Sequence, residues 1–367
     1  MNMAIAGGGT GGHLFPGIAI AEEFLRREPH NQVFFIGTER GLESRIIPHL
    51  GLQLETIRVR GLKGQGMAAQ LIALSMLPWA FIRSWFCLRR FQAHIVCGVG
   101  GYISGPAVLA GVVMGITTVI HEQNSFPGLS NRILGRYVDR VCVSYRESME
   151  FFPGNRTVFT GLPLRREFVQ ARMPQRQEVF TILVLGGSQG SREINQAMKA
   201  ALPYLLPVKD RIQIIHQSGP ADAALLADTY HMYGIRAQVI AFIDDMTGAY
   251  GNAHLVISRA GAGTLAEITC CGRAALLIPY PHAANNHQEK NARVLVDAEA
   301  ALMILSRELN GEKLARAIIE TEHDRSILAY MEQRVQSLAR PKAAQDIVDL
   351  CYQQVAKRAG NGRVADH

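Results

Sequence analysis

Short apolar runs that end in glycine recur along the chain, and each is followed by a stretch with helical periodicity. Residues 3–7 are MAIAG, residues 33–37 are VFFIG, residues 95–100 are IVCGVG and residues 181–187 are TILVLGG. Continuous apolar runs of this length are typical of strands buried on both faces of a parallel sheet. The alternation predicts an α/β protein with ligand loops at the carboxyl ends of its strands.

The same succession of units occurs twice. Residues 93–96 (AHIV) align with residues 253–256 (AHLV), ITTVI after Gly115 aligns with RAALLI after Gly272, and the glycine loop at 7–12 has a counterpart at 186–191. This repeat predicts two similar α/β halves. We expect a first domain at 1–162, a second at 163–340, a final helix at about 341–357 and a flexible tail at 358–367. A length of 367 residues suits two domains.

The stretch 258–291 carries residues suited to a nucleotide sugar. Gly261 and Gly263 form a loop after an apolar run, and Thr264 is expected to open a helix whose N-terminal amides favour a diphosphate. Glu267 could accept two hydrogen bonds from the vicinal hydroxyls of a ribose. The following loop supplies His287, Gln288 and Asn291 for sugar hydroxyls. Thr264 and Glu267 also fit a T-x-x-E capping box, so plain helix capping remains an alternative.

The first glycine loop also fits the dinucleotide pattern G-x-G-x-x-G, at Gly7, Gly9 and Gly12. That pattern requires an acidic residue at the end of the second strand to bind ribose. The available acid, Glu39, comes late and beyond Gly37. The sequence therefore disfavours an NAD-dependent oxidoreductase.

The charge balance indicates an anionic partner. The chain has 38 Lys and Arg against 31 Asp and Glu, a net charge of +7, which suits phosphates or an acidic membrane surface. The basic residues are spread along the chain, and no basic helix, zinc spacing or RNA-binding aromatic motif occurs, so we expect no nucleic-acid partner. The six cysteines form no C-x-x-C motif, which indicates reduced thiols in the cytoplasm.

Residues 71–91, LIALSMLPWAFIRSWFCLRRF, are rich in aromatic side chains and end in arginines. The stretch holds both tryptophans of the chain and is too short to span a bilayer. An amphipathic helix of this composition could lie in the interface of an anionic membrane. A helix buried in the first domain is the alternative, and composition does not decide between them.

Eight motifs occur in an order that resembles the MurG family. They are AGGGTGGH, GGYISGP, HEQN, GLPLR, GGSQGS, FIDDM, RAGAGTLAE and HQEKNA, and the resemblance covers residues 3 to about 340. These enzymes are the UDP-N-acetylglucosamine:undecaprenyl-diphospho-muramoylpentapeptide N-acetylglucosaminyltransferases of peptidoglycan synthesis. The resemblance implies the GT-B fold, with two Rossmann-like domains facing across a cleft and the final helix at about 341–357 crossing back to the first domain. It also implies a peripheral enzyme at the cytoplasmic face of the cell membrane.

The resemblance assigns the donor, UDP-N-acetylglucosamine, to the second half. Ile243 would meet uracil through its backbone, Glu267 would bind ribose, and Ser188 would hold phosphate. Arg165 would be a further donor contact at the hinge. The remaining donor contacts implied in this way are Gly261, Ala262, Gly263, Thr264 and Leu265 for the diphosphate, and His287 and Gln288 for the sugar.

In the first half, the resemblance implies that Thr10, Gly11, Gly12 and Asn124 close over donor and acceptor. His13 would be the general base for the acceptor C4 hydroxyl, because the dipole of the helix that it begins keeps the imidazole neutral. A histidine without a chemical role at a helix start is the alternative. The hydroxyl would attack C1 of the α-linked donor with inversion.

No metal or cofactor is expected. Asp244 and Asp245 lack the D-x-D spacing of a magnesium site, and backbone amides could hold the leaving UDP.

The polyprenyl-linked acceptor would require docking on an anionic membrane surface, through Trp79, Phe81 and Trp85.

Three other functions remain open at this point. Another GT-B enzyme, such as a glycolipid glycosyltransferase, would share the donor motifs. A UDP-N-acetylglucosamine 2-epimerase would act on the free nucleotide sugar and need no lipid. A non-catalytic nucleotide-sugar binder would need no base.

Overall fold

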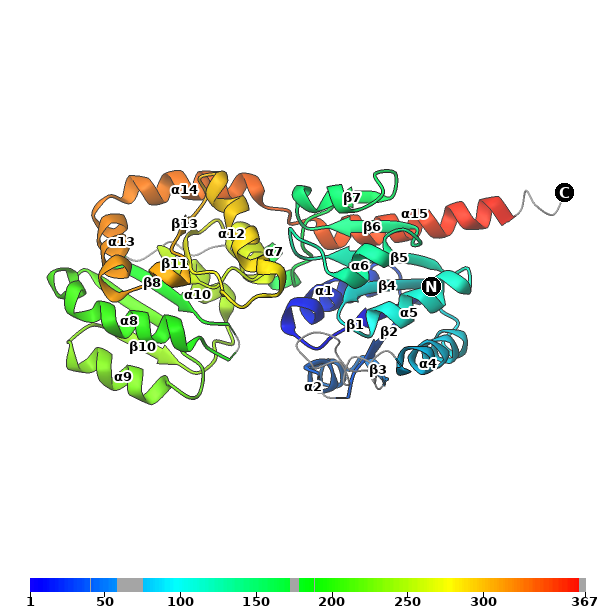
Figure 1. Ribbon diagram of the computed structural model, residues 1–367, viewed down its shortest axis with the longest axis horizontal. Helices are drawn as coiled ribbons and strands as arrows, with labels where there is room; N and C mark the ends of the chain where they lie inside the picture. Colours follow the sequence, from blue (N-terminus) through cyan, green and yellow to red (C-terminus); the bar gives the residue numbers. More distant parts are fainter. Residues whose placement is uncertain (40, 58–74, 172–177, 188, 363–367) are drawn as a thin grey trace. The chain divides into compact units, whose positions relative to one another are not determined.

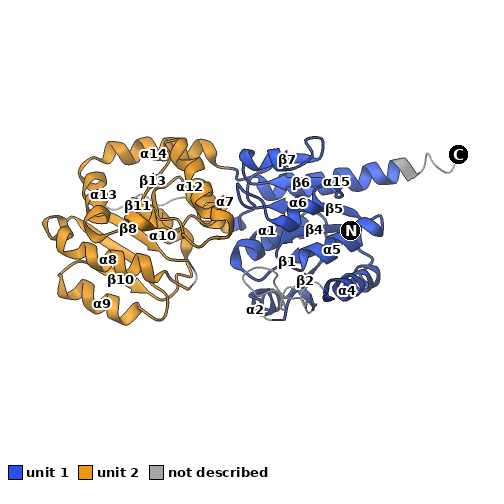
Figure 2. Cartoon of the chain, in the orientation of Figure 1, with its two compact units in different colours: residues 1–166, 340–367 blue, residues 167–339 orange. Residues whose placement is uncertain are grey.

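The computed structural model describes residues 1–39, 41–57, 75–171, 178–187 and 189–362. Four predictions from the sequence fall wholly or partly outside these residues. They are a loop at 61–66 (GLKGQG), indicated by its composition, the first part of the aromatic stretch at 71–74, Ser188, and residues 172–177 of an interdomain linker predicted over 160–178. The chain divides into two compact units (Figure 2): Met1–Arg166 with Arg340–His367, and Glu167–Ala339.

The first unit is built on a parallel sheet. Among the described residues, seven strands form it in the order β3-β2-β1-β4-β5-β6-β7 (Figure 1). The strands are β1 (Asn2–Gly7), β2 (Gln32–Gly37), β3 (Gln53–Thr56), β4 (Ile95–Gly100), β5 (Thr117–Glu122), β6 (Arg140–Val143) and β7 (Thr157–Phe159). The helices are α1 (Gly11–Arg27), α2 (Glu43–His49), α4 (Leu77–Arg90), α5 (Ser104–Val113), α6 (Leu129–Leu134), the 3-10 helix η1 (Arg146–Phe151) and α15 (Ala343–Gly362).

Helices cover both faces of this sheet because successive strand residues point to opposite sides. On one face, Met3 and Ile5 of β1 pack with α1, α2 and α15 in one buried cluster. On the other, Ala4 and Ala6 pack with α4, α5 and α6 in a second cluster. Burial on both faces explains why the strands are continuous apolar runs.

The final helix packs on the first unit through residues such as Ile347 and Cys351. It continues to Gly362, whereas the sequence predicts an end at about residue 357 and a tail from 358. Arg358 accounts for the difference: its Nη2 donates to both carboxylate oxygens of Asp139, at 2.8 and 2.9 Å, and its Nη1 donates to the Gly115 carbonyl. These contacts hold the additional turn against the unit.

The second unit repeats the architecture. Among its described residues, six parallel strands take the order β10-β9-β8-β11-β12-β13. The strands are β8 (Phe180–Leu185), β9 (Ile212–Gln217), β10 (Ala237–Ile240), β11 (Leu255–Ser258), β12 (Ala274–Leu277) and β13 (Leu302–Met303). The helices are α7 (Arg166–Gln170), α8 (Arg192–Leu205), η2 (Leu206–Val208), α9 (Ala223–Met232), α10 (Met246–Asn252), α11 (Ala262–Cys271), η3 (Ala284–Asn286), α12 (His287–Asp297), η4 (Ser306–Glu308), α13 (Gly311–His323) and α14 (Arg325–Leu338).

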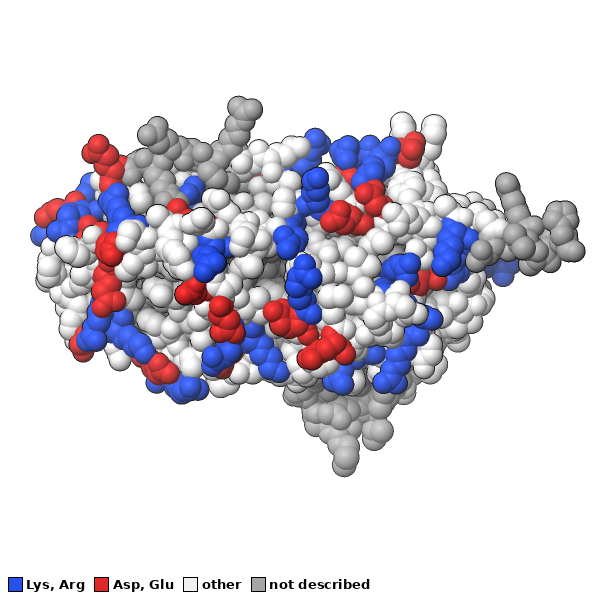
Figure 3. Space-filling view, turned by 90° about the horizontal axis from the view of Figure 1, so that it is seen from above, with Lys and Arg blue, Asp and Glu red and all other residues white. Residues whose placement is uncertain are grey.

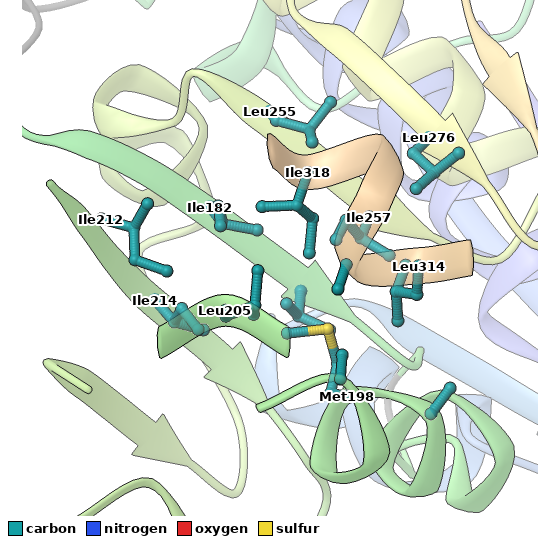
Figure 4. Packing of buried hydrophobic residues seen from close by; sticks show 14 of the residues in the cluster. Ile182, Met198, Leu205, Ile212, Ile214, Leu255, Ile257, Leu276, Leu314 and Ile318 are labelled. Carbon is teal, nitrogen blue, oxygen red and sulfur yellow. The ribbon is translucent and has the colours of Figure 1, made fainter. Parts of the chain in front are cut away.

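One face of this second sheet carries a large aliphatic core. Ile182 of β8 and Ile257 of β11 point toward Met198 of α8 and toward Leu314 and Ile318 of α13 (Figure 4). All five side chains are buried. Since burying an aliphatic side chain stabilises the fold by about 1.5–3 kcal/mol, this core gives the ligand loops a rigid support.

The internal repeat predicted from the sequence is confirmed by two histidines. His94 and His254 precede β4 and β11, the strands that pair with the first strand of each unit. In the first unit the Asn2 amide donates to Nδ1 of His94 at 3.2 Å, and in the second the Thr181 amide donates to Nδ1 of His254 at 3.0 Å. Each histidine thus ties its strand to the start of the neighbouring one.

The strand order reverses at one place in each sheet, between β1 and β4 and between β8 and β11. At such a switch point the loops on the two sides turn away from each other and leave a crevice at the carboxyl edge, where ligands of α/β proteins bind. The loops in question are 7–10 and 100–103 in the first unit, and 186–191 and 259–261 in the second. These four loops contain four of the glycine-rich motifs.

Two surface properties bear on possible partners. None of the described helices combines the length and the apolar character needed to cross a bilayer. On the face shown in Figure 3, Lys and Arg side chains are interspersed with Asp and Glu. The basic side chains on that face are spread out rather than gathered in one patch, as their spread along the sequence predicts.

Candidate functional site

Helix α11 presents its N-terminus at the carboxyl edge of the second sheet. It begins at Ala262, with Gly261 in the capping position, two residues before the expected start at Thr264. No side chain in the described part of the chain caps it, so the capping-box alternative for Thr264 and Glu267 is wrong. The uncapped amides of the first turn and the helix dipole have the chemistry to bind an anion.

Glu267 lies in the next turn of α11 and is held by a tyrosine. The Tyr250 hydroxyl donates to Oε2 of Glu267 at 2.9 Å. Burial, together with the nearby Glu267 carboxylate, raises the pKa of Tyr250 well above its usual range. Tyr250 therefore stays protonated and fixes the carboxylate, whose other oxygen can accept from a ligand hydroxyl.

Ile243 and Asp245 lie in the loop that follows β10. Ile243 is buried, and its amide donates to Oε1 of Gln217 at 3.0 Å. Asp245 caps α10 by accepting from the Gly248 amide at 2.8 Å. The Asp-Asp pair of the FIDDM motif thus includes a helix cap.

The residues expected to hold the sugar begin a helix rather than lying in a loop. His287 opens α12, with its Nδ1 2.8 Å from the Ala284 carbonyl. Oε1 of Gln288 accepts from the Tyr280 amide at 2.9 Å. Asn291 lies one turn later and is buried. The structure brings these side chains to one helix start, beside the carboxyl end of β12.

Arg259 is a residue that motif reasoning missed. It follows β11 at the switch point, and its Nη2 donates to Oγ of Ser191 at 2.9 Å and to Oε2 of Glu193 at 2.6 Å. Nη1 donates to the Ile278 carbonyl at 3.2 Å. Arg259 thereby joins the loops that follow β8, β11 and β12. Its position inside the RAGAGT motif was the available signal.

His13 stands at the switch point of the first unit, in the first turn of α1. Its Nδ1 is 3.3 Å from Oγ1 of Thr10, the residue that precedes the helix. A Cβ placed on Gly100 would lie 2.6 Å from Cδ2 and 2.9 Å from Nε2 of the imidazole. The ring therefore packs directly on the backbone of Gly100, the last residue of β4, and Gly12 beside it is exposed.

Asn124 is placed by the carboxylate of Glu122, the last residue of β5. Oε1 of Glu122 accepts from the Asn124 amide at 3.0 Å, and Oε2 accepts from Nδ2 of Asn131 at 2.9 Å and from the Gly128 amide at 3.2 Å. Burial raises the pKa of Glu122 despite these hydrogen bonds. The HEQN motif thus contains both a half-buried candidate contact, Asn124, and the buried group that holds it, Glu122.

Arg165 belongs to the first unit, beyond the boundary expected at residue 162. Its guanidinium carbon lies 5.0 Å from the centroid of the Phe15 ring, on the same helix as His13. Gly11 approaches the same ring, since a Cβ there would lie 3.0 Å from Cε2 of Phe15. Arg165 is therefore near the start of α1.

Glu43 is a second residue that sequence reasoning missed, because its partners are distant in the chain. It is fully buried and accepts from the Gly9 amide at 2.8 Å, the Thr38 amide at 2.9 Å and the Thr38 hydroxyl at 2.7 Å. Burial acts to raise the pKa of Glu43, but these hydrogen bonds have the larger combined effect. The pKa of Glu43 therefore lies below its usual range. A Cβ on Gly8 would collide with this carboxylate.

We expect Glu43→Gln to lower the free energy of unfolding by about 1–3 kcal/mol at pH 7, because the amide nitrogen must face a buried donor. The folded-state pKa of Glu43 is depressed, so its contribution is complete above the ordinary value of 4.5 and is lost as pH falls through the lower folded value. Urea unfolding of both proteins between pH 3 and pH 8 measures this, with the exposed Glu28→Gln as control. A deficit that does not shrink below about pH 4 contradicts the assignment.

Helix α4 shows which aromatic side chains reach the surface. Trp79, Ile82 and Phe86 are 45%, 51% and 63% exposed. Phe81 and Trp85, expected at the surface, instead pack against the buried cluster beneath the helix. The buried positions Ala80, Ser84 and Leu88 recur every four residues and set this orientation.

The chain matches two family models. The glycosyltransferase family 28 N-terminal domain matches residues 3–143, and the glycosyltransferase family 28 C-terminal domain matches residues 181–347. The first range covers β1 to β6 of the first sheet, and the second covers β8 to β13 of the second sheet and extends into α15.

Similar proteins carry one name. The UDP-N-acetylglucosamine--N-acetylmuramyl-(pentapeptide) pyrophosphoryl-undecaprenol N-acetylglucosamine transferase of Citrifermentans bemidjiense is 48% identical over 351 residues, 95% of this chain and 98% of that protein. The protein of the same name from Myxococcus xanthus is 48% identical over 366 residues, 99% of this chain and 96% of that protein.

The crystal structure of Acinetobacter baumannii MurG superposes with a TM-score of 0.76 at 29% identity, covering 96% of this chain and 99% of that chain. With the two parallel α/β units, this confirms the GT-B fold class. The 48% identity to the two relatives, over nearly the whole length, shows the family as well: the chain belongs to the MurG family, within glycosyltransferase family 28.

Proposed function

We propose that the protein transfers N-acetylglucosamine from UDP-N-acetylglucosamine to the C4 hydroxyl of undecaprenyl-diphospho-N-acetylmuramoyl-pentapeptide, converting lipid I to lipid II in peptidoglycan biosynthesis. The observation that carries this proposal is the 48% identity, over nearly the full chain, to transferases named for these substrates. In this proposal the first unit binds the lipid-linked acceptor, and the second unit binds the nucleotide sugar.

The donor is held at the carboxyl edge of the second sheet. The uncapped first turn of α11, from Gly261 to Leu265, receives the diphosphate, and the dipole of α11 stabilises its charge. Glu267, fixed by Tyr250, binds the ribose hydroxyls. Ile243 meets uracil through its backbone. Arg165 and Ser188 are further donor contacts in this proposal.

The sugar of the donor is placed at the start of α12. His287 and Gln288 are half-buried, with polar atoms engaged by local backbone, so they are held in defined orientations. Imidazole and carboxamide groups both pair with sugar hydroxyls. Asn124, Thr10, Gly11 and Gly12 of the first unit complete the contacts to donor and acceptor.

His13 is the general base of the proposed reaction. With the Nδ1 proton donated to the Thr10 hydroxyl, Nε2 carries the lone pair. Nε2 takes the proton of the acceptor C4 hydroxyl as its oxygen bonds to C1 of the donor. The bond from C1 to the diphosphate oxygen breaks, and UDP leaves with the electron pair. Attack on the face opposite UDP inverts the anomeric centre.

Charge on the departing UDP is stabilised by the amides at the start of α11 in this proposal, without a metal ion. The test is transfer of labelled N-acetylglucosamine to a lipid-linked muramoyl-pentapeptide in the presence of EDTA. Formation of the β-1,4-linked product supports the proposal. UDP binding without transfer overturns it in favour of another GT-B activity, for which 2-epimerisation of the free nucleotide sugar is assayed directly.

The membrane contact is proposed for one side of the first unit. Helix α5 packs between α4 and α6, and apolar side chains are exposed on all three. They are Trp79, Ile82 and Phe86 on α4, Leu109 and Val113 on α5, and Leu129 and Ile133 on α6. The exposed arginines of these helices, Arg83, Arg89, Arg90 and Arg132, supply positive charge. This combination suits peripheral docking on an anionic bilayer, at the cytoplasmic face of the cell membrane.

We expect serine at Trp79, Ile82 and Phe86 together to weaken binding to anionic liposomes by about 100-fold, because partial burial of each side chain contributes about 1 kcal/mol. UDP affinity should not change. Flotation with phosphatidylglycerol-containing vesicles measures the effect. The control is Leu225→Ser with Met232→Ser, which removes exposed apolar side chains from α9 of the other unit. Equal vesicle binding by both variants contradicts the assignment.

A further inference from the structure

Gln217 is a buried amide side chain at the end of β9, with 5% of its surface exposed. Two loops meet at it. One is the glycine loop after β8, at 186–190, which includes the GGSQG motif. The other is the loop after β10, at 241–245, which includes Ile243. No motif reasoning assigned Gln217 a role, and it lies outside the residues proposed to contact the donor.

Both polar atoms of its carboxamide are used. Nε2 donates to the carbonyl of Gly187 at 2.8 Å, and Oε1 accepts from the amide of Ile243 at 3.0 Å. A carboxamide offers a donor and an acceptor at its end, so it can bridge a carbonyl and an amide at once. A carboxylate keeps only the acceptor, and an aliphatic side chain keeps neither. The two loops are thus joined through one side chain.

The backbone next to Gln217 reinforces its connections to the end of β10 and to the glycine loop. The Ser218 amide donates to the Ile240 carbonyl at 3.0 Å. A Cβ on Gly190 would collide with the Ser218 carbonyl, and one on Gly219 would collide with the Gln189 carbonyl. Since Gly190 and Gly219 have φ of +76° and +80°, the close approach requires glycine at both positions. Gln189 and Gly190 of the glycine loop therefore lie directly on residues 218 and 219.

A chain of buried hydrogen bonds to side chains of α8 and α9 fixes the end of β9. Nδ2 of Asn195 donates to the Ser218 carbonyl at 2.9 Å, and its Oδ1 is 3.0 Å from Nε2 of His216. Nδ1 of His216 is 2.9 Å from the Tyr230 hydroxyl. Burial lowers the pKa of His216 to about 4, so the ring is neutral at pH 7 and can take part with one donor and one acceptor. The strand end that carries Gln217 is therefore rigid.

We infer that Gln217 is a positioning residue that couples recognition of the base to recognition of the diphosphate of a uridine diphosphate. This inference rests on the proposed donor site, in which the loop at 241–245 meets uracil and the loop at 186–190 meets phosphate. Because the Ile243 amide is used by Gln217, Ile243 offers its carbonyl to the base. A carbonyl accepts from N3–H of uracil but not from N3 of cytosine, which has no hydrogen.

Two variants separate the two hydrogen bonds. Gln217→Leu removes both, and we expect the Kd of UDP to rise about 10- to 100-fold and the preference for UDP over CDP to fall about tenfold, as two buried hydrogen bonds are lost. Gln217→Glu keeps the acceptor for Ile243 and loses the donor to Gly187. We expect it to weaken UDP and CDP binding alike while the UDP:CDP ratio stays within about threefold of the wild type, because the acceptor that fixes Ile243 is kept.

Isothermal titration of the full-length protein with UDP and with CDP measures both quantities, and thermal unfolding shows that each variant is folded. The control is Gln213→Leu, which removes the hydrogen bond from Gln213 to Thr181 earlier in the same strand and should leave both affinities unchanged. In the transfer assay, KM for UDP-N-acetylglucosamine should rise in Gln217→Leu more than kcat falls.

The outcomes distinguish this inference from the proposed function. If wild-type protein does not bind UDP, the proposed donor site fails. If it does, and Gln217→Leu retains both its UDP affinity and its UDP:CDP ratio, the coupling role is overturned. Equal losses for UDP and CDP in Gln217→Leu, with the ratio intact, also overturn it, because they indicate general destabilisation. Should Gln217→Leu not fold, an altered ratio in Gln217→Glu contradicts the assignment of its acceptor to Ile243.

Discussion

Replacing His13 by alanine is expected to lower kcat for N-acetylglucosamine transfer by about 10²- to 10⁴-fold, the range that a general base contributes. The variant lacks the nitrogen that takes the proton of the acceptor hydroxyl. The affinity for UDP should not change, because the donor contacts of the second unit are intact. Transfer to a lipid-linked muramoyl-peptide gives kcat, and calorimetric titration with UDP gives the affinity.

The matched control is His49→Ala, an exposed histidine at the end of α2 in the same unit. It should retain wild-type kcat. A conservative variant, His13→Gln, keeps a polar side chain near Thr10 but no basic nitrogen, so it should be as slow as the alanine variant. Wild-type kcat in His13→Ala removes this residue as the base and leaves the transferase assignment in place.

Replacing Glu267 by alanine is expected to raise the Kd of UDP by about 100-fold, since two hydrogen bonds between a carboxylate and ribose hydroxyls contribute about 3 kcal/mol. The same change should raise KM for UDP-N-acetylglucosamine. Titration of the variant with UDP and with 2′,3′-dideoxy-UDP tests the origin of the effect: the dideoxy ligand should bind the wild type and the variant about equally.

Tyr250→Phe tests how much the orientation of Glu267 contributes to UDP affinity, separately from the contribution of its charge. It removes the hydroxyl that donates to Oε2, and we expect a smaller increase in Kd, about fivefold, which corresponds to one hydrogen bond. Glu312→Ala is the control, because Glu312 is an exposed residue of α13 paired with Arg316. Unchanged UDP affinity in Glu267→Ala means that the ribose lies elsewhere.

Some features followed from the sequence because they depend on local pattern. Continuous apolar runs predicted strands buried on both faces, and both parallel sheets confirm this. The aligned pairs around His94 and His254 predicted the internal repeat, and the structure gives both histidines the same hydrogen bond. The ordered motifs predicted the family, which the relatives confirm. In each case the signal consists of short segments, each of which can be recognised from its own residues.

Features that depend on how a helix faces its neighbours were not predicted. The aromatic stretch is apolar around most of its circumference, so periodicity could not tell which side packs inward. Contact with α5 and the sheet turned Phe81 and Trp85 inward and left Ile82 and Phe86 exposed. The start of α11 at Ala262, with Gly261 in the capping position, also differed, because a glycine can take the extended capping conformation without a side-chain signal.

The sequence by itself determined the α/β class, the repeat, the glycine loops and the family, since strand burial, helix periodicity and loop composition are properties of short segments. Only the tertiary structure decided which polar groups hold those loops in place. Glu43 reaches Gly9 across 34 positions of the chain, and Gln217 reaches Gly187 across 30 and Ile243 across 26. Such hydrogen bonds form because folding brings distant strand ends to one edge of a sheet, and no local pattern specifies them.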